Sequence, residues 1–163
     1  MPPAATRTIF AEMIGALSRR LRTPVFEPHI TLGGCADVSE QETVARVTRL
    51  ANDLAPIPIQ LAGVAYTDAY FRCLFFTADK TPELLAAYNA AATCMRSLPD
   101  ADFLPHLSLV YGNVANAEKE TIIEEFSGRL PITFVADSLA LCLPVGSPEQ
   151  WRLLGPFNLM RTV

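Results

Sequence analysis

Hydrophobic residues recur at helical spacing in four stretches of the chain. The first, 6–21, places its apolar residues on one stripe and ends in a cluster of arginines. The second opens with a Ser-Glu-Gln-Glu capping box at 39–42 and continues to about residue 54. The third begins at a Thr-Pro pair at 81–82, and the fourth covers 116–126, with an asparagine as its expected cap. The pattern therefore predicts four helices.

Strand-like patterns lie between these helices. They cover 57–67, 70–77, 132–143 and 151–160, and the third has a candidate break near Asp137. Together with two short strands described below, they give the order helix, strand, helix, strand, strand twice. We therefore expect an α+β fold that arose by internal duplication. It has two pseudo-symmetric lobes, each a small, mainly antiparallel sheet with outer helices, and a central cleft between them.

The domain organisation follows from length and from this repeat. A chain of 163 residues is expected to form a single two-lobed domain, 1–163, with approximate halves 1–80 and 81–163. In the simplest arrangement each half supplies its own sheet, and exchange of strands between the lobes is the alternative.

The two short strands share one sequence frame. Residues 26–32 read Phe-Glu-Pro-His-Ile-Thr-Leu, and residues 103–109 read Phe-Leu-Pro-His-Leu-Ser-Leu. The two histidines of the chain, His29 and His106, occupy the same place in the two copies, 77 residues apart (106 minus 29). Because alternate residues of a strand point to one face, each imidazole is expected beside the hydroxyl two residues later.

Two opposed imidazoles favour chemistry in which one proton is removed and another is delivered. The ordinary pKa of histidine is about 6.5, so both protonation states are accessible near neutrality. One neutral ring can activate water while the other, protonated, protonates the leaving oxygen. The hydroxyls of Thr31 and Ser108 can donate to the oxygens of a phosphate held between them. The pattern best fits attack on a small phosphodiester, with neither metal nor cofactor.

Other interpretations stay open for several of these residues. A single histidine on a strand is often structural, and only the duplicated frame favours catalysis. A metal site would need a third ligand, and neither copy offers one in register. Arg72 and Arg152 are either phosphate contacts or solvated charges. Trp151 is either part of the site or a wall of the second lobe.

Composition narrows the class of protein. Half of the residues are hydrophobic and the net charge is −4, which argues against a broad basic surface for long nucleic acids. No apolar run approaches the ~20 residues of a membrane span, and no secretory signal is evident. The four cysteines show no metal-binding spacing and are read as reduced thiols. We expect a cytoplasmic, monomeric protein that does not bind membranes.

The paired frames resemble the two-histidine phosphoesterase superfamily, and most closely its cyclic phosphodiesterase branch. The resemblance covers the element order from about residue 3 to residue 160, and its sharp identity lies in 26–32 and in Pro-His-Leu-Ser-Leu-Val-Tyr-Gly at 105–112. It implies hydrolysis of ADP-ribose 1″,2″-cyclic phosphate or of nucleoside 2′,3′-cyclic phosphates to monophosphates.

The resemblance also implies roles for individual residues. By position, His29 and His106 are the catalytic pair, Thr31 and Ser108 bind phosphoryl oxygens, and Tyr111 lines the site. It leaves open which histidine is the base; we favour His106 as base and His29 as acid.

Two departures from the family pattern leave alternatives. Relatives usually begin with a strand before the first helix, and residues 1–3 leave almost no room for one. LigT-type 2′-5′ RNA ligases usually end the second motif with a basic residue, where this chain has Val-Tyr-Gly at 110–112.

The expected partner is a small cyclic-phosphate nucleotide. The alternatives are an enzyme acting on RNA ends, including a 2′-5′ ligase, and a non-catalytic nucleotide- or RNA-binding module.

Overall fold

A computed structural model describes residues 1–34, 39–97, 100 and 102–160 of the chain. Its helices are α1 (Ala4–Leu21), α2 (Glu40–Asp53), α3 (Pro82–Met95) and α4 (Asn116–Ser127), with short 3-10 turns η1 (Tyr70–Arg72) and η2 (Pro148–Gln150). Its strands are β1 (Ile57–Tyr66), β2 (Leu74–Ala78), β3 (His106–Val110), β4 (Ile132–Ala136), β5 (Ser138–Leu143) and β6 (Arg152–Asn158). The four predicted helices are all present.

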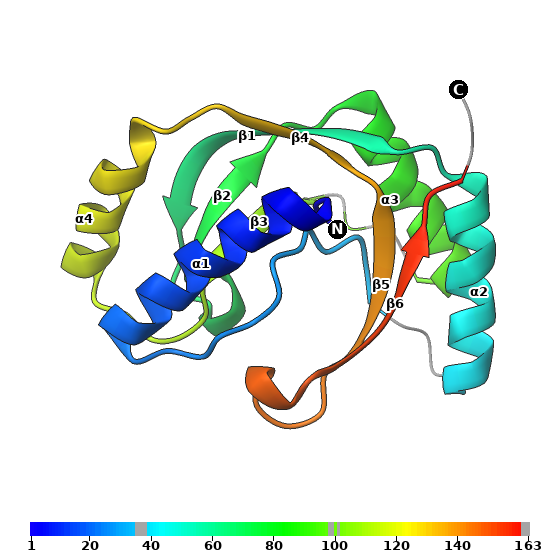
Figure 1. Ribbon diagram of the computed structural model, residues 1–163, viewed down its shortest axis with the longest axis horizontal. Coiled ribbons are helices and arrows are strands. Elements are labelled where there is room, and N and C mark those ends of the chain that lie inside the picture. The colour runs from blue at the N-terminus through cyan, green and yellow to red at the C-terminus, as the bar shows by residue number, and fades with distance from the viewer. Residues whose placement is uncertain (35–38, 98–99, 101, 161–163) are drawn as a thin grey trace.

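The strands form two antiparallel sheets with helices outside them. One sheet has four strands in the order β3-β2-β1-β4, and the other is the hairpin β5-β6. Helices α1 and α4 contact the larger sheet, while α2 packs against α3 and against the hairpin (Figure 1). The predicted α+β fold with two lobes is confirmed.

The expectation that each half of the chain supplies its own sheet is wrong. The four-stranded sheet takes β1 and β2 from the first half and β3 and β4 from the second, whereas both strands of the hairpin come from the second half. The chain passes from one sheet to the other at Asp137, between β4 and β5, where the sequence predicted a break. The second half of the chain therefore contributes strands to both sheets.

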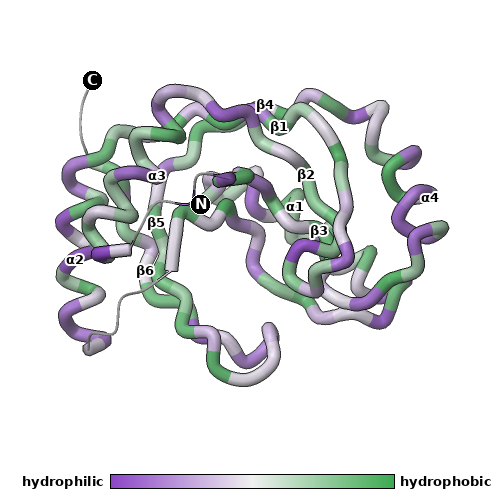
Figure 2. Tube along the Cα trace, turned by 180° about the vertical axis from the view of Figure 1, so that it is seen from behind, coloured by the Kyte–Doolittle hydropathy of each residue, from purple (hydrophilic) through white to green (hydrophobic). Residues whose placement is uncertain are grey.

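Helix starts follow the capping signals in two cases and not in a third. The hydroxyl of Ser39 accepts the backbone N–H of Glu42, and that of Thr81 accepts the N–H of Leu84, each at 3.2 Å. The cap expected at Asn116 is wrong, because helix α4 already includes that residue and no side chain caps its start. In Figure 2, α2 and α4 alternate between hydrophilic and hydrophobic residues, as helices that lie on a core do.

Two predicted strands are shorter than expected. In the first histidine frame only Ile30 pairs, through a single antiparallel bridge to Leu107. The proline at 28 removes one backbone donor, which limits the ladder there. The strand expected at 70–77 begins at Leu74, because the N–H of Arg72 closes a 3-10 turn on the carbonyl of Ala69 at 3.0 Å.

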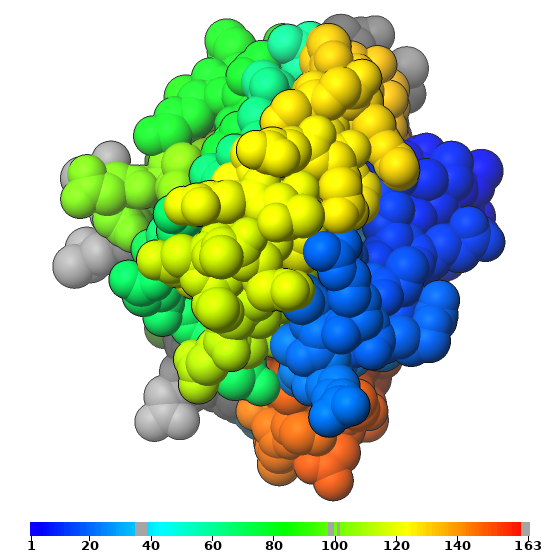
Figure 3. Space-filling view, turned by 90° about the vertical axis from the view of Figure 1, so that its left-hand side faces the viewer, coloured from blue at the N-terminus to red at the C-terminus, as the bar shows by residue number. Residues whose placement is uncertain are grey.

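The core joins α1 to the larger sheet. Phe10 of α1 is 1% exposed and its ring centroid lies 6.2 Å from that of Phe76 on β2, which is fully buried. On the outer face of the same lobe, the end of α1 lies beside α4 (Figure 3), where Arg20 and Glu125 form an ion pair of 2.7 Å. None of the helices in the described part of the chain has the length and apolar character needed to cross a membrane.

Truncation of Phe76 to alanine tests this core. We expect Phe76→Ala to lower the free energy of unfolding by about 3–5 kcal/mol, because a fully buried aromatic side chain leaves a cavity that the sheet cannot fill. Urea denaturation followed by circular dichroism measures the change. The matched control is Val145→Ala, whose side chain is 78% exposed and whose loss should be near neutral. Equal effects of the two substitutions would contradict this picture of the core.

Candidate active site

Both histidine rings are held by the same short-range hydrogen bond. Nδ1 of His29 lies 2.7 Å from the carbonyl oxygen of Glu27, and Nδ1 of His106 lies 2.7 Å from the carbonyl oxygen of Leu104. A carbonyl can only accept, so each Nδ1 carries the proton that it donates. Each Nε2 is therefore the nitrogen left to exchange protons with a ligand.

The proline before each histidine explains this geometry. A proline confines the preceding residue to extended backbone, so Glu27 and Leu104 cannot turn into a helix. Pro28 and Pro105 are both buried and have no N–H of their own. The carbonyl two residues before each histidine then faces the imidazole. The Phe-x-Pro-His frame therefore sets the ring tautomer as well as the strand start.

The single bridge between the two frames brings their polar residues together. Ile30 pairs with Leu107 in antiparallel register. Continuing this register by one residue on each side places Thr31 opposite His106, and His29 opposite Ser108. Opposed residues of an antiparallel pair point to the same face. The polar side chains of both frames therefore share one face, and the side chains of Ile30 and Leu107 point to the other.

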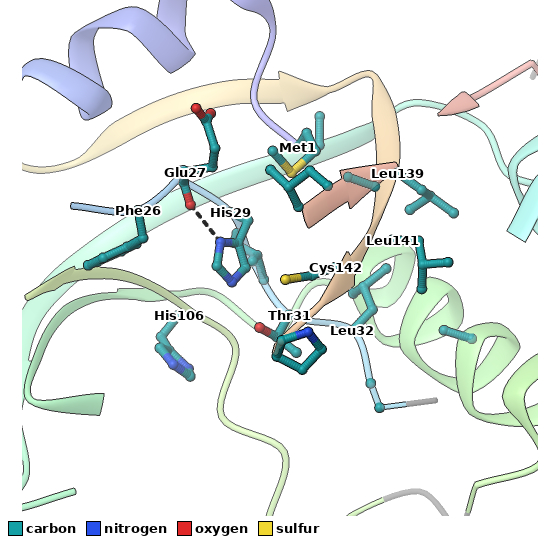
Figure 4. A pocket seen from close by; sticks show the side chains of 18 of the residues that line it. Met1, Phe26, Glu27, His29, Thr31, Leu32, His106, Leu139, Leu141 and Cys142 are labelled. Atoms are coloured by element: carbon teal, nitrogen blue, oxygen red, sulfur yellow. Dashed lines mark hydrogen bonds between the residues drawn. The ribbon is translucent and has the colours of Figure 1, made fainter. Parts of the chain in front are cut away.

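A cavity of about 900 Å³ opens on this face. His29, Thr31, His106 and Tyr111 all line it, and Figure 4 shows the two imidazoles reaching into it from different segments of the chain. Its volume lies in the range of small-molecule sites. The structure thus brings four of the five residues singled out from the sequence to one cavity.

Ser108, the fifth, lies behind the cavity wall. Its side chain is buried, with 4% of the residue exposed, and it is not among the residues that line the cavity. Its hydroxyl donates to the carbonyl of Phe71 at 3.4 Å and lies within hydrogen-bonding reach of the Tyr111 phenol. In this conformation Ser108 supports the wall that Phe71 and Tyr111 form.

Tyr111 joins the two histidine frames. Its ring stacks on Phe26 of the first frame, with centroids 3.7 Å apart and an interplanar angle of 15°. Burial raises the pKa of the Tyr111 hydroxyl to about 12, although Ser108 acts in the opposite direction. The phenol is therefore neutral at physiological pH and available only as a hydrogen-bonding group.

Three aromatic rings form one wall of the cavity. Phe71 lies 5.4 Å from Tyr111 and 5.6 Å from Trp151, measured between ring centroids, and all three line the cavity. The sequence left Trp151 undecided and gave Phe71 no role. The only signal for Phe71 was its place next to Arg72, in a segment that resembles a strand but folds as η1.

The far part of the cavity is apolar. Leu32, Leu139, Leu141 and Met1 line it on the side of the hairpin β5-β6 (Figure 4). Sequence reasoning missed this part, because these residues follow an ordinary core pattern and meet the site only through the fold.

Burial has the largest effect on the pKa of both histidines. It lowers the pKa of His29 and of His106 below the ordinary value, and the hydrogen bonds that the rings donate to the carbonyls of Glu27 and Leu104 oppose the shift. The positive charge of Arg72 lowers the pKa of His106 further. The charge of His106 in turn lowers the pKa of His29, so the two rings influence each other electrostatically.

Within the described ranges, no group of three or more His, Cys, Asp or Glu side chains is arranged to hold a metal ion. Of the cysteines expected to be reduced thiols, the one at 35 lies outside the described residues, while Cys73 is a buried free thiol.

Comparisons with known proteins give a family, a curated relative and a structure of the same fold. The model of the 2′-5′ RNA ligase superfamily matches residues 5–146. A cyclic phosphodiesterase from Arabidopsis thaliana is 24% identical over 166 residues, covering 98% of this chain and 92% of the relative. The crystal structure of TT0787 from Thermus thermophilus superposes with a TM-score of 0.60 at 19% identity, covering 97% of this chain and 93% of that one.

The hydrogen bonds at Nδ1 predict a definite NMR signature. Both histidines should show the Nδ1-protonated tautomer at pH 8, because each Nδ1 donates to a carbonyl. Both should titrate below the ordinary value of about 6.5, because burial disfavours the charged ring. Long-range ¹H–¹⁵N correlation spectra across pH 4–8 measure both properties, and with two histidines in the chain the signals are easily resolved. An Nε2-protonated tautomer at either ring would contradict this assignment.

Proposed function

Because the chain belongs to the 2′-5′ RNA ligase superfamily, we propose that it hydrolyses small cyclic phosphodiesters to monophosphates without a metal ion. The substrates would be ADP-ribose 1″,2″-cyclic phosphate, nucleoside 2′,3′-cyclic phosphates, or both. The family and the Arabidopsis relative support an enzyme that processes phosphodiesters. The observation that carries the finer proposal is the matched pair of imidazoles, each with Nδ1 bound to a carbonyl, on one cavity.

The reaction uses the two free ring nitrogens. Nε2 of one neutral imidazole takes a proton from water, and the resulting hydroxide forms a bond to phosphorus. The bond from phosphorus to one ring oxygen of the cyclic phosphate breaks. Nε2–H of the other, protonated imidazole gives its proton to that oxygen, which leaves as a hydroxyl group. The product is a monophosphate ester, and exchange with solvent restores the starting protonation of both rings.

We assign His106 as the base and His29 as the acid. Burial and the charge of Arg72 both favour the neutral form of His106, which is the form that a base needs. At His29 the carboxylate of Glu27 favours the charged form, although burial and the positive charges of the N-terminus and of His106 act against it. Thr31 is exposed and lines the cavity, so its hydroxyl can donate to a phosphoryl oxygen.

The aromatic wall suits a small nucleotide. Phe71 is 54% exposed, so its ring offers a face on which a base can stack, and it lines the same cavity as the imidazoles. The net charge of −4 argues against a long RNA track, which a ligase of RNA ends would need. These observations favour a cyclic nucleotide over a polymer.

A turnover assay tests the proposed function. Purified protein with a nucleoside 2′,3′-cyclic phosphate and EDTA should release a nucleoside monophosphate at a rate that chelation does not change. His29→Ala and His106→Ala should each lower kcat by roughly 10²–10⁴-fold, because each removes one positioned proton-transfer group. Liquid chromatography of the product, with a parallel assay on ADP-ribose 1″,2″-cyclic phosphate, gives rate, isomer and substrate preference.

Three outcomes would count against this function. Activity that disappears with EDTA would exclude the metal-free mechanism. A histidine variant with near-normal turnover and unchanged thermal unfolding would remove that ring from the mechanism. Joining of RNA ends without hydrolysis of either cyclic phosphate would favour the ligase.

The pH dependence should be bell-shaped and displaced toward acid. The base must be neutral and the acid protonated, and kcat/KM reports both groups in the free enzyme. Burial lowers the pKa of both rings, so the rate should be highest below about pH 6.5 and fall through neutrality as the acid loses its proton. Initial rates from pH 4.5 to 9 measure the profile. A rate that rises steadily up to pH 9 would contradict a pair of imidazoles.

A further inference from the structure

The two arginines that the sequence could not distinguish have different surroundings. The side chain of Arg152 is 58% exposed, and its Nη2 lies 2.5 Å from a carboxylate oxygen of Glu40. Arg72 is half-buried, lines the cavity and forms neither an ion pair nor a side-chain hydrogen bond with any described residue. Its Nε is buried from solvent without a partner among those residues.

An unpaired guanidinium in such a place favours an anion. Withdrawing a charged donor from water is unfavourable unless an acceptor replaces the water. The cost remains until an acceptor is supplied. An anionic group that enters the cavity would provide the missing acceptor.

The backbone around Arg72 is fixed against the second histidine frame. The carbonyl of Tyr70 accepts the N–H of Gly112 at 2.9 Å, and the carbonyl of Phe71 accepts the hydroxyl of Ser108 at 3.4 Å. On its other side, the hydroxyl of Thr67 donates to the carbonyl of Arg72 at 2.6 Å. Turn η1 is thus hydrogen-bonded to the end of β3, which carries His106, so the arginine is positioned before any ligand binds.

We propose that the guanidinium of Arg72 binds the phosphoryl group of the substrate beside His106 and stabilises the negative charge that develops on its oxygens. This inference rests on the proposed function, and of the two alternatives that the sequence left open for Arg72 it selects the phosphate contact. Arg72 and His106 line the same cavity, and the charge of Arg72 lowers the pKa of His106. The planar fork of a guanidinium can donate two parallel hydrogen bonds to phosphoryl oxygens, which a lysine cannot reproduce.

Substitution of the two arginines tests the proposal by kinetics. Arg72→Gln should lower kcat/KM for a nucleoside 2′,3′-cyclic phosphate by roughly 10²–10³-fold, because it removes charge stabilisation from the transition state. Arg72→Lys should recover part of this loss, since it restores the charge without the fork. Arg152→Gln is the matched control and should stay within about twofold of the wild type, as an exposed ion pair contributes little.

Phosphate binding provides a readout that does not need turnover. Inorganic phosphate is titrated into the wild type and the variants while the signals of the two histidines are followed by NMR, with His29→Gln used for assignment. Arg72→Gln should weaken phosphate binding at least ~10-fold, the scale of a lost charge-assisted contact, and raise the pKa of His106 more than that of His29. Arg152→Gln should change neither the phosphate affinity nor the pKa of His106.

The two readouts separate this inference from the proposed function. If the wild-type protein binds phosphate through Arg72 but hydrolyses no cyclic phosphate, the proposed function is wrong. The anion site at Arg72 is then still supported. An Arg72→Gln variant with unchanged kcat/KM and phosphate affinity would overturn the role of Arg72. Thermal unfolding checks that each variant is folded, and Arg72→Lys takes the place of Arg72→Gln if the latter is not.

Discussion

The candidate site depends on one repeated interaction, the hydrogen bond from a histidine Nδ1 to the carbonyl two residues earlier. It occurs at His29 and at His106 with the same length, 2.7 Å. The bond uses only local backbone, which an intervening proline keeps extended. Each frame can therefore orient its own ring without help from the rest of the protein. The fold has only to bring the two frames together, which the bridge between Ile30 and Leu107 does.

The sequence was sufficient where local signals and the fold agree. The capped helices and the break at Asp137 follow from patterns that lie within a few residues, and the meeting of the two histidines follows from the repeated frame. The sequence did not predict the local structure where tertiary contacts determine it. The turn at Tyr70–Arg72 resembles a strand in its alternation, and the hydrogen bond from the Ser108 hydroxyl to the carbonyl of Phe71 has no signal in the sequence.

The two histidine frames are supported by different contacts. The second frame is a true strand, paired with β2 through His106 and Thr77, and its imidazole lies beside Phe75 with ring centroids 5.0 Å apart. The first frame has one bridge and relies on the stacking of Phe26 on Tyr111. The two frames thus match in their polar residues and differ in the contacts that support them.

The passage of the chain through Asp137 has a mechanical consequence. The N–H of Asp137 donates to the carbonyl of Met1 and its carbonyl accepts the N–H of Leu159, so segments near both ends of the described chain meet at the residue where β4 continues into β5. The two lobes are therefore joined by several hydrogen-bonded backbone segments rather than by a single pivot. Moving the lobes apart would strain all of these segments at once, so the junction at Asp137 restricts how far the cavity can widen.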